Sequence, residues 1–246
     1  MEKYINKDNI YDFAFINEDT LKMPIKAICV RFHGLGWIGK ITTSPKRDEY
    51  LGERGIVSIF PYYNPWGWMN PETVSIADDL VDAVRDKFSL GDDIPLVSEG
   101  GSMGGLGSIM YCKFTKNSPI CCASDSPVCD LYGGLDSFYS DAKNTIYSAY
   151  FNCEGTLEEA TRDHSPLQNC EILPRIPYYV VCGDLDKLVK MEENAIPFVK
   201  KMKECGHNIQ LKIISNYDHC RLDDFDDEHI KYVNFIEECV DNYRKK

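Results

Sequence analysis

Residues 97–107, VSEGGSMGGLG, place five glycines around Ser102, and the apolar run IPLV (94–97) leads into them. A glycine inside a helix or strand costs up to about 1 kcal/mol of stability relative to alanine. Five glycines so close together therefore indicate that the backbone conformation or a close contact requires them. Neither the dinucleotide pattern G-x-G-x-x-G nor the phosphate-loop pattern G-x-x-x-x-G-K-[ST] fits it. The pattern G-x-S-x-G does fit, and there the serine sits on a strained turn between a strand and a helix. A glycine-rich loop without chemistry is the alternative that this stretch alone leaves open.

Length and charge limit the classes of protein to consider. The chain has 246 residues and a net charge of −12. That length suits one large α/β domain or two small ones, and we predict a single domain over residues 1–246. Nucleic acids and anionic membrane surfaces attract clustered lysine and arginine, so the acidic balance predicts that neither is a partner. No apolar run approaches the roughly 18 residues of a membrane-spanning helix.

The cysteines indicate a reducing compartment. There are eleven, they show no C-x-x-C pair, and most lie inside apolar runs, as Cys29, Cys121, Cys122 and Cys182 do. This distribution is typical of buried free thiols rather than of a disulfide framework. The first residues, MEKYINKDNIYDF, contain no apolar signal segment, so we expect a cytoplasmic protein.

Apolar runs alternate with helical patterns along the chain. Strands are predicted at 27–32, 55–60, 94–99, 119–124, 176–183 and 209–215, with an antiparallel edge strand at 11–17. Helices are predicted at 71–88, at 103–114, up to a glycine stop at Gly206, and at 227–243. This alternation predicts an α/β fold of three layers: a mostly parallel, twisted sheet with helices on both faces. Residues 130–173 are too many for a simple crossover, and we expect them to form a small cap insertion.

Polar residues gather where the predicted strands end. His33 and Gly34 follow the first parallel strand, and Ser102, Asp186 and His219 follow later ones. Ligands of such sheets bind at the carboxyl ends of the strands, so these side chains are expected to meet there. A serine hydroxyl becomes a nucleophile when a histidine takes its proton and a carboxylate orients that histidine. Ser102, His219 and Asp186 are the candidates for these three roles.

Several motifs together resemble the α/β-hydrolases, most closely the small esterases and the prolyl-oligopeptidase-like catalytic domains. They are HGLG (33–36), GGSMGG (100–105), SPL (165–167), GDLDKLV (183–189), NAIPFVKKMKECGHNIQLKII (194–214) and DHC (218–220). The resemblance covers nearly the whole chain from about residue 27, so the leading strands usual in the family are expected to be reduced. It implies Ser102 as nucleophile, His219 as base and Asp186, rather than Asp184, as the acid.

The resemblance also implies an oxyanion hole. The first donor is the Met103 amide, which a helix N-terminus would favour. The second comes from the loop after His33, as the Leu35 amide or, as the less favoured alternative, that of Gly36. His33 itself is expected to shape this loop by hydrogen bonding. No metal or organic cofactor is implied.

The loop PYYNPWGWMN, residues 61–70, is rich in aromatic side chains. Tyr62, Trp66 and Trp68 are predicted to bind substrate, because flat aromatic rings pack against sugars and aryl groups. A hydrophobic flap packed on the core is the alternative. Glu99 is either a buried structural acid or a charge in the pocket, and Asp218 is expected to be a solvated loop acid.

These expectations define a function. The chain is predicted to be a serine hydrolase that cleaves carboxylic esters of small molecules, with short acyl chains, through an acyl-enzyme. The first alternative is a serine peptidase of the prolyl-oligopeptidase type, which ranks second because the sequence shows no propeller or other large gating domain. The alternative from another class is a non-catalytic binding protein with a hydrolase fold, which a complete triad disfavours.

Overall fold

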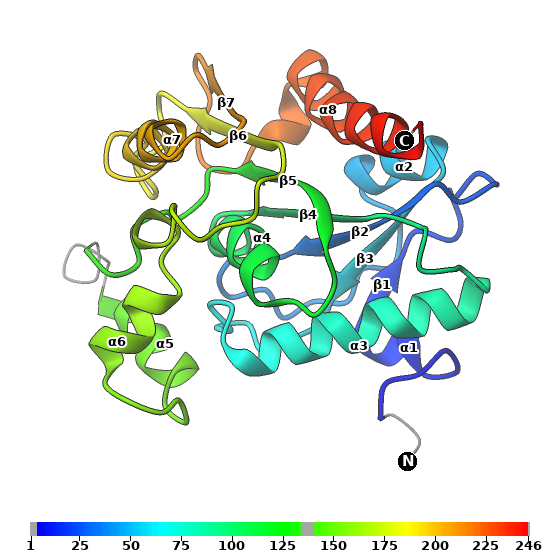
Figure 1. Ribbon diagram of the computed structural model, residues 1–246, viewed down its shortest axis with the longest axis horizontal. Helices are drawn as coiled ribbons and strands as arrows, with labels where there is room; N and C mark the ends of the chain where they lie inside the picture. Colours follow the sequence, from blue (N-terminus) through cyan, green and yellow to red (C-terminus); the bar gives the residue numbers. More distant parts are fainter. Residues whose placement is uncertain (1–3, 134–139, 246) are drawn as a thin grey trace.

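A seven-stranded sheet forms the centre of the molecule in the computed structural model, which describes residues 4–133 and 140–245. The strand order is β1-β3-β2-β4-β5-β6-β7; β1 pairs antiparallel with β3, and every other pairing is parallel (Figure 1). The strands are β1 (Ala14–Ile16), β2 (Ala27–Phe32), β3 (Ile56–Pro61), β4 (Leu96–Gly101), β5 (Pro119–Asp125), β6 (Tyr178–Gly183) and β7 (Ile209–Ile214). The mostly parallel sheet and its antiparallel edge strand are confirmed.

Helices cover both faces of this sheet, which confirms the three layers (Figure 1). The helices are α1 (Ile10–Phe13), α2 (Lys46–Glu53), α3 (Pro71–Phe88), α4 (Met103–Phe114), α5 (Ser140–Ala149), α6 (Leu157–Asp163), α7 (Ala195–Glu204) and α8 (Asp226–Arg244), with short 3₁₀ turns η1 (Pro166–Gln168) and η2 (Leu222–Asp224). Helices α2 and α8 pack on one face, and α3, α4 and α7 pack on the other. Each face therefore has its own hydrophobic core.

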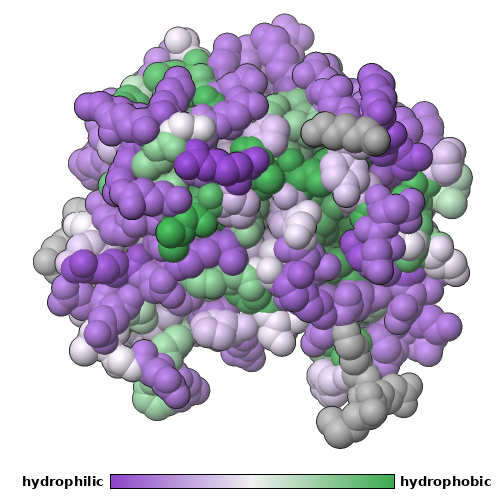
Figure 2. Space-filling model, in the orientation of Figure 1, coloured by the Kyte–Doolittle hydropathy of each residue, from purple (hydrophilic) through white to green (hydrophobic). Residues whose placement is uncertain are grey.

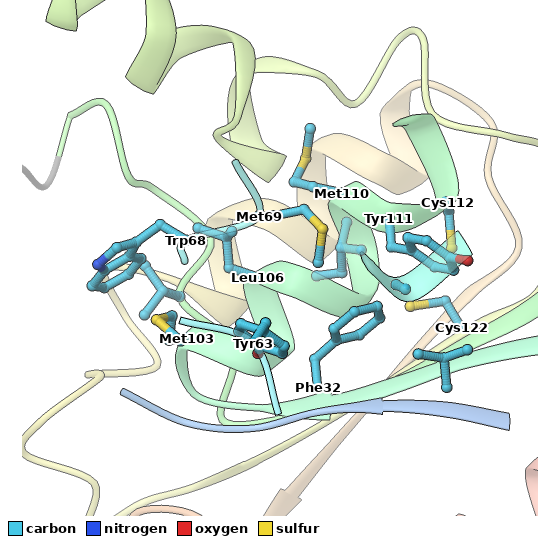
Figure 3. Close-up of a cluster of buried hydrophobic side chains, with 14 of the residues drawn as sticks. Phe32, Tyr63, Trp68, Met69, Met103, Leu106, Met110, Tyr111, Cys112 and Cys122 are labelled. Carbon is cyan, nitrogen blue, oxygen red and sulfur yellow. The ribbon is translucent and has the colours of Figure 1, made fainter. Parts of the chain in front are cut away.

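Strand β2 shows why the apolar runs become central strands. All six of its residues are buried. Ile28, Val30 and Phe32 point into the core beneath α3 and α4, whereas Ala27 and Cys29 point toward α2 and α8. A parallel strand covered on both faces needs such a continuous apolar run. Figure 3 shows the larger core, in which the ring of Phe32 packs 5.1 Å from that of Tyr111.

Helix α3 begins and ends as its sequence predicts. The side chain of Asn70 accepts a hydrogen bond from the Thr73 amide at 3.0 Å, and Pro71 occupies the first turn. Helix α7 ends at Glu204, and Gly206 follows with a left-handed φ of 81°, as expected for a glycine stop. Local capping chemistry therefore sets the ends of both helices.

Two elements differ from the prediction. The edge strand is shorter than 11–17, because residues 10–13 form the single turn α1 and only Ala14–Ile16 pairs with β3. Helix α2 was not predicted. Its sequence, KRDEYLGE, lacks an apolar stripe because Arg47 and Asp48 are the residues that point inward, beside Leu51.

The predicted cap segment contains α5, α6 and η1; its residues 134–139 lie outside the described part of the chain. Hydrogen bonds connect this segment to the loop before α3. The indole nitrogen of Trp68 donates to Thr145 at 2.9 Å, and the Tyr150 hydroxyl donates to the Trp68 carbonyl at 2.6 Å. The Asn70 side chain donates to the Ala149 carbonyl at 2.9 Å. These bonds hold α5 beside the start of α3, where Figure 1 shows it.

The surface is mostly hydrophilic on the face shown in Figure 2, in line with the net charge of −12. Within residues 4–133 and 140–245, no helix combines the length and the apolar character needed to cross a membrane. All eleven cysteines are free thiols, and seven of them are buried, as the sequence predicts.

Four of the five histidines are buried, and burial lowers the pKa of each: His33, His164, His207 and His229. The pKa of His229 falls from 6.5 to about 3, first because of its burial and then because Arg47 and Arg31 lie nearby. Such a histidine takes up a proton on unfolding. Its contribution to folding is therefore complete near neutral pH and is lost as the pH falls from about 6.5 toward 3.

We therefore expect the urea midpoint of unfolding to be clearly lower at pH 5 than at pH 7. His229 alone should remove about 2 kcal/mol of unfolding free energy at pH 5. The variant His229→Gln cannot titrate but keeps an acceptor for the Arg47 side chain, so it should lose less stability between the two pH values. Equal losses in the variant and the wild type would contradict this role of His229.

Candidate active site

The glycines around Ser102 allow two chain segments to touch. Ser102 lies between β4 and α4 with φ 59° and ψ −124°, a strained conformation for a residue with a side chain. A Cβ on Gly104 would lie 2.0 Å from the carbonyl oxygen of Phe32, and one on Gly100 would lie 2.1 Å from the Gly104 carbonyl oxygen. Only glycine fits at these two positions. The missing side chains therefore let β4 turn sharply into α4 and present the serine at the end of the sheet.

The structure brings the three predicted side chains together. The Oγ of Ser102 lies 2.8 Å from Nε2 of His219, and Nδ1 of His219 lies 2.7 Å from Oδ2 of Asp186. The other oxygen of Asp186 accepts hydrogen bonds from the amides of Leu188 and Val189, both at 2.9 Å. The Asp186 carboxylate is thus fixed in orientation, with one oxygen for the backbone and one for the histidine.

The two neighbouring acids have other partners. Asp184 accepts a hydrogen bond from the Asn216 amide at 2.8 Å, which joins the turns after β6 and β7. Asp218 is exposed and accepts from the His219 amide at 2.8 Å. The geometry therefore selects Asp186 as the partner of His219, as the family resemblance implied.

Asp125, at the end of β5, connects the serine turn to the histidine loop. Its carbonyl oxygen accepts from the Ser102 amide at 2.9 Å. Its carboxyl oxygens lie 2.7 and 2.8 Å from the hydroxyl of Tyr217, two residues before His219. Burial raises the pKa of Asp125, while Arg47 acts in the opposite direction. Asp125 was not predicted; its one signal in the sequence is an acidic residue directly after the predicted strand 119–124.

The amides of Met103 and Leu35 are the predicted donors of an oxyanion hole. Met103 is the first residue of α4, where the amide has no acceptor within the helix. The Gly36 amide donates to the Pro65 carbonyl at 3.0 Å and is therefore occupied. Leu35 lines the cavity in front of Ser102. The arrangement thus favours the Leu35 amide over that of Gly36 as the second donor.

His33 supports the loop that carries Leu35. Its ring stacks on Tyr63 with centroids 3.9 Å apart, and its Nδ1 lies 2.8 Å from the Gly34 carbonyl oxygen. The Tyr63 hydroxyl in turn donates to the His33 carbonyl at 3.1 Å. Burial lowers the pKa of His33, so the ring is neutral near pH 7. His33 therefore shapes the loop by hydrogen bonding and stacking, as predicted.

A cavity of about 630 Å³ opens on Ser102 and His219. Much of its wall is apolar, formed by Leu35, Trp37, Ile41, Trp68, Val128 and Ala142. Arg31, Arg47, Asp125 and Asp223 supply a charged part of the wall. Among the described residues, no group of three or more histidine, cysteine or acidic side chains is arranged to hold a metal ion.

The aromatic loop contributes less to the cavity than predicted. Trp68 lines the cavity but is only 2% exposed. Tyr62 and Trp66 are not among its lining residues. The cavity therefore gives no support to their predicted role in substrate binding. The Tyr62 hydroxyl accepts a hydrogen bond from the Ile41 amide at 3.0 Å, and Trp66 is 42% exposed.

Trp37 lies at the cavity although it was not predicted to bind substrate. It lines the cavity, is 42% exposed, and packs edge-on against Phe60 with ring centroids 5.4 Å apart. The signal in the sequence is its place directly after the HGLG motif, on the loop that holds Leu35. A tryptophan there is available to pack against a bound substrate.

These positions predict different effects for the three tryptophans. Trp68→Ala should lower the unfolding free energy by about 3–5 kcal/mol, because it empties a buried site. Trp66→Ala should change neither stability nor kcat/KM appreciably. Trp37→Ala should lower kcat/KM on esters of bulky alcohols while small acetate esters are much less affected. Thermal unfolding and ester kinetics on the three variants check this; a selective loss in Trp66→Ala would restore the original prediction.

Glu99 is a buried structural acid, which decides between the two alternatives left open by the sequence. Its carboxylate accepts from Arg31 at 2.8 Å, from Arg47 at 2.6 Å and from the Tyr232 hydroxyl at 2.9 Å. Burial alone would raise its pKa, but the two guanidinium groups lower it overall. Glu99 is therefore ionised and holds the two arginines at the cavity wall.

The structure is similar to several solved hydrolases. It superposes with a TM-score of 0.64 on a puromycin-hydrolyzing peptidase from Mycobacterium tuberculosis, at 17% identity, over 80% of this chain and 31% of that one. For the acylaminoacyl peptidase of Pyrococcus horikoshii the TM-score is 0.66 at 14% identity, over 88% of this chain and 37% of that one. The chain thus spans about a third of the length of these peptidases.

An S-formylglutathione hydrolase from Agrobacterium tumefaciens has comparable length. It is 14% identical, with a TM-score of 0.67, and the match covers 89% of this chain and 86% of that one. At such identities these likenesses show the fold alone. No curated protein sequence matches the chain. The sequence model of the prolyl oligopeptidase family, in contrast, matches residues 67–242, from the loop before α3 to the last turn of α8. Because this match spans well over half of the sequence, the chain belongs to the prolyl oligopeptidase family of α/β-hydrolases.

Proposed function

We propose that this serine hydrolase cleaves carboxylic esters of small molecules, with short acyl groups, through an acyl-enzyme. The observation that carries the proposal is the continuous hydrogen-bonded chain from Ser102 through His219 to Asp186, at the wall of a cavity of about 630 Å³. A buried carboxylate, an imidazole and a serine in this order are the parts that acyl transfer requires.

The first half of the reaction acylates the serine. His219 Nε2 takes the proton from Ser102 Oγ as Oγ bonds to the ester carbonyl carbon, and Asp186 stabilises the imidazolium. The negative charge on the carbonyl oxygen is bound by the Met103 and Leu35 amides, each worth roughly 2.7–4 kcal/mol. The carbon–oxygen bond to the alcohol then breaks, and His219 returns the proton to the departing alkoxide.

The second half releases the acid. Water enters the space that the alcohol leaves, His219 takes its proton, and the hydroxide oxygen bonds to the acyl carbon. Collapse of this intermediate breaks the bond to Ser102 Oγ, which recovers its proton from His219. The products are the carboxylic acid and the free enzyme, so no cofactor enters the balance.

The cavity supports short acyl groups and small alcohols. Its wall is apolar for the most part, and Trp68 and Ala142, both lining residues, limit it on the side of the predicted cap segment. A serine peptidase of the prolyl-oligopeptidase type is the second candidate, and the family match favours it. The two candidates share the same triad and differ in the leaving group, an alcohol or an amine.

A substrate panel separates these candidates. We expect hydrolysis of 4-nitrophenyl acetate and butyrate and of acetylated sugars, with kcat/KM falling for 4-nitrophenyl decanoate. Aminoacyl 4-nitroanilides should react much more slowly. Preferred cleavage of the anilides would establish the peptidase instead. Absence of turnover on every compound by a folded protein would support a binding protein with a hydrolase fold.

A further inference from the structure

Two arginines form part of the cavity wall on the side of the sheet that α2 and α8 cover. Arg31 comes from β2 and Arg47 from α2, and both line the cavity that opens on Ser102. Their side chains are only 11% and 10% exposed. Burying a charged group is costly, so each guanidinium needs partners. The positions of those partners show which hydrogen-bond donors of the two arginines are still free to bind a ligand.

Buried carboxylates occupy one side of both guanidinium groups. Arg31 donates from Nε to Glu99 at 2.8 Å and from Nη1 to Asp48. Arg47 donates from Nη1 to Glu99 at 2.6 Å and from Nε to Nε2 of His229 at 3.3 Å. The Nε and Nη1 groups of the two arginines are thus occupied by the buried carboxylates of Asp48 and Glu99 and by His229, and Asp125 is a third buried carboxylate beside Arg47.

The Nη2 groups have weaker partners: that of Arg47 forms a long ion pair with the buried Asp125 carboxylate. Neither Nη2 donates a hydrogen bond to a side chain or carbonyl within the described residues; Arg47 Nη2 lies 3.6 Å from Asp125, beyond hydrogen-bond distance. Neither atom is among the fully buried side-chain atoms that lack a partner, and both arginines line the cavity. Each arginine therefore presents unused donors to the space in front of Ser102.

The acidic side chains nearby are already satisfied. Both oxygens of Asp125 lie within 2.8 Å of the Tyr217 hydroxyl, and one also accepts from Ser126. Asp223 has a side chain that is 58% exposed and therefore solvated. Apart from the solvated Asp223 carboxylate, the hydrogen-bonding capacity left on the charged wall consists of donors, which suits an acceptor group on the substrate.

We propose that the substrate carries a carboxylate, which the Nη2 groups of Arg31 and Arg47 bind while the ester carbonyl lies at Ser102. A guanidinium is always charged, and its planar donors match the two oxygens of a carboxylate. The apolar wall opposite takes the uncharged part of the molecule. This inference rests on the proposed ester hydrolysis and adds the substrate class to it.

Matched esters test the proposal on the wild-type enzyme. On the alcohol side, 4-acetoxybutanoate is compared with neutral butyl acetate and with cationic acetylcholine; on the acyl side, monomethyl glutarate is compared with methyl pentanoate. We expect kcat/KM for the anionic ester of at least one pair to exceed that of its neutral partner about tenfold, the effect of one charge-assisted hydrogen bond. The pair that shows the preference identifies the side.

Conservative variants connect the preference to the arginines. Arg47→Lys keeps the charge for Glu99 but leaves no second donor group, so the ratio of kcat/KM between the anionic and neutral esters should fall toward one. Arg54→Lys is the matched control, because Arg54 pairs with Glu237 at 2.9 Å and does not line the cavity. The ratio is independent of the fraction of folded enzyme, so partial unfolding of a variant does not affect it.

Three results would overturn the proposal: equal or lower kcat/KM on both anionic esters, preference for acetylcholine, or an unchanged ratio in both Arg47→Lys and Arg31→Lys. In each case, turnover of butyl acetate that disappears in Ser102→Ala would leave the proposed ester hydrolysis standing. Loss of the charge preference and loss of the proposed function are therefore distinguishable.

Discussion

Ser102→Ala is expected to lower kcat for ester hydrolysis by a factor on the order of 10⁴ or more, because it removes the atom that forms the acyl-enzyme. His219→Ala should have a loss of similar size, since the 2.8 Å contact between its Nε2 and Ser102 Oγ is the route for the proton. The measurement is kcat on 4-nitrophenyl acetate, with circular dichroism to show that both variants are folded.

The double variant provides the sharper check. Nucleophile and base act in the same step, so removing both should cost little more than removing one. Losses that multiply would mean that the two residues act independently. Substantial hydrolysis by Ser102→Ala alone would contradict the covalent mechanism.

Asp186→Asn is expected to lower kcat about 10⁴-fold through the tautomer of His219. The oxygen that accepts the Leu188 and Val189 amides must remain an oxygen, so the new amide nitrogen would face Nδ1 of His219. His219 would then accept at Nδ1 and carry its proton on Nε2. In that tautomer it cannot take the proton of Ser102.

Asp184→Asn and Asp218→Asn are the matched controls. Asp184 accepts the Asn216 amide, and Asp218 accepts the His219 amide, so neither carboxylate contacts the imidazole. We expect less than about tenfold loss in either, since surface substitutions of this kind have small effects. A larger loss in Asp184→Asn than in Asp186→Asn would reverse the assignment of the acid.

The sequence predicts the parts of this molecule that depend on local pattern. Strand β2 is apolar apart from Arg31 because helices cover both faces of the sheet, and a run of this kind can be recognised in the sequence. The turn at Ser102 is visible because close contact with Phe32 excludes any side chain at Gly104. The triad residues follow from chain order, since each one comes after a predicted strand.

Residues whose roles depend on distant partners were not predictable. Helix α2 has no apolar stripe because Arg47 and Asp48 face a buried cluster contributed by β2 and β4. Asp125 acts through Tyr217, 92 residues away in the sequence. The aromatic content of residues 61–70 led to the prediction that Tyr62 and Trp66 bind substrate. Only the folded structure shows that Trp37 lines the cavity and that these two residues do not.

Covalent labelling with a fluorophosphonate tests the central claim, an activated nucleophile at Ser102, most directly. The account predicts one adduct per chain, assigned to Ser102 by peptide mass mapping, slowed by short-chain esters and absent in Ser102→Ala. Labelling should also fall strongly in His219→Ala, because a serine without its base is a poor nucleophile. No adduct on folded wild-type protein, or equal labelling of the wild type and Ser102→Ala, would contradict the account.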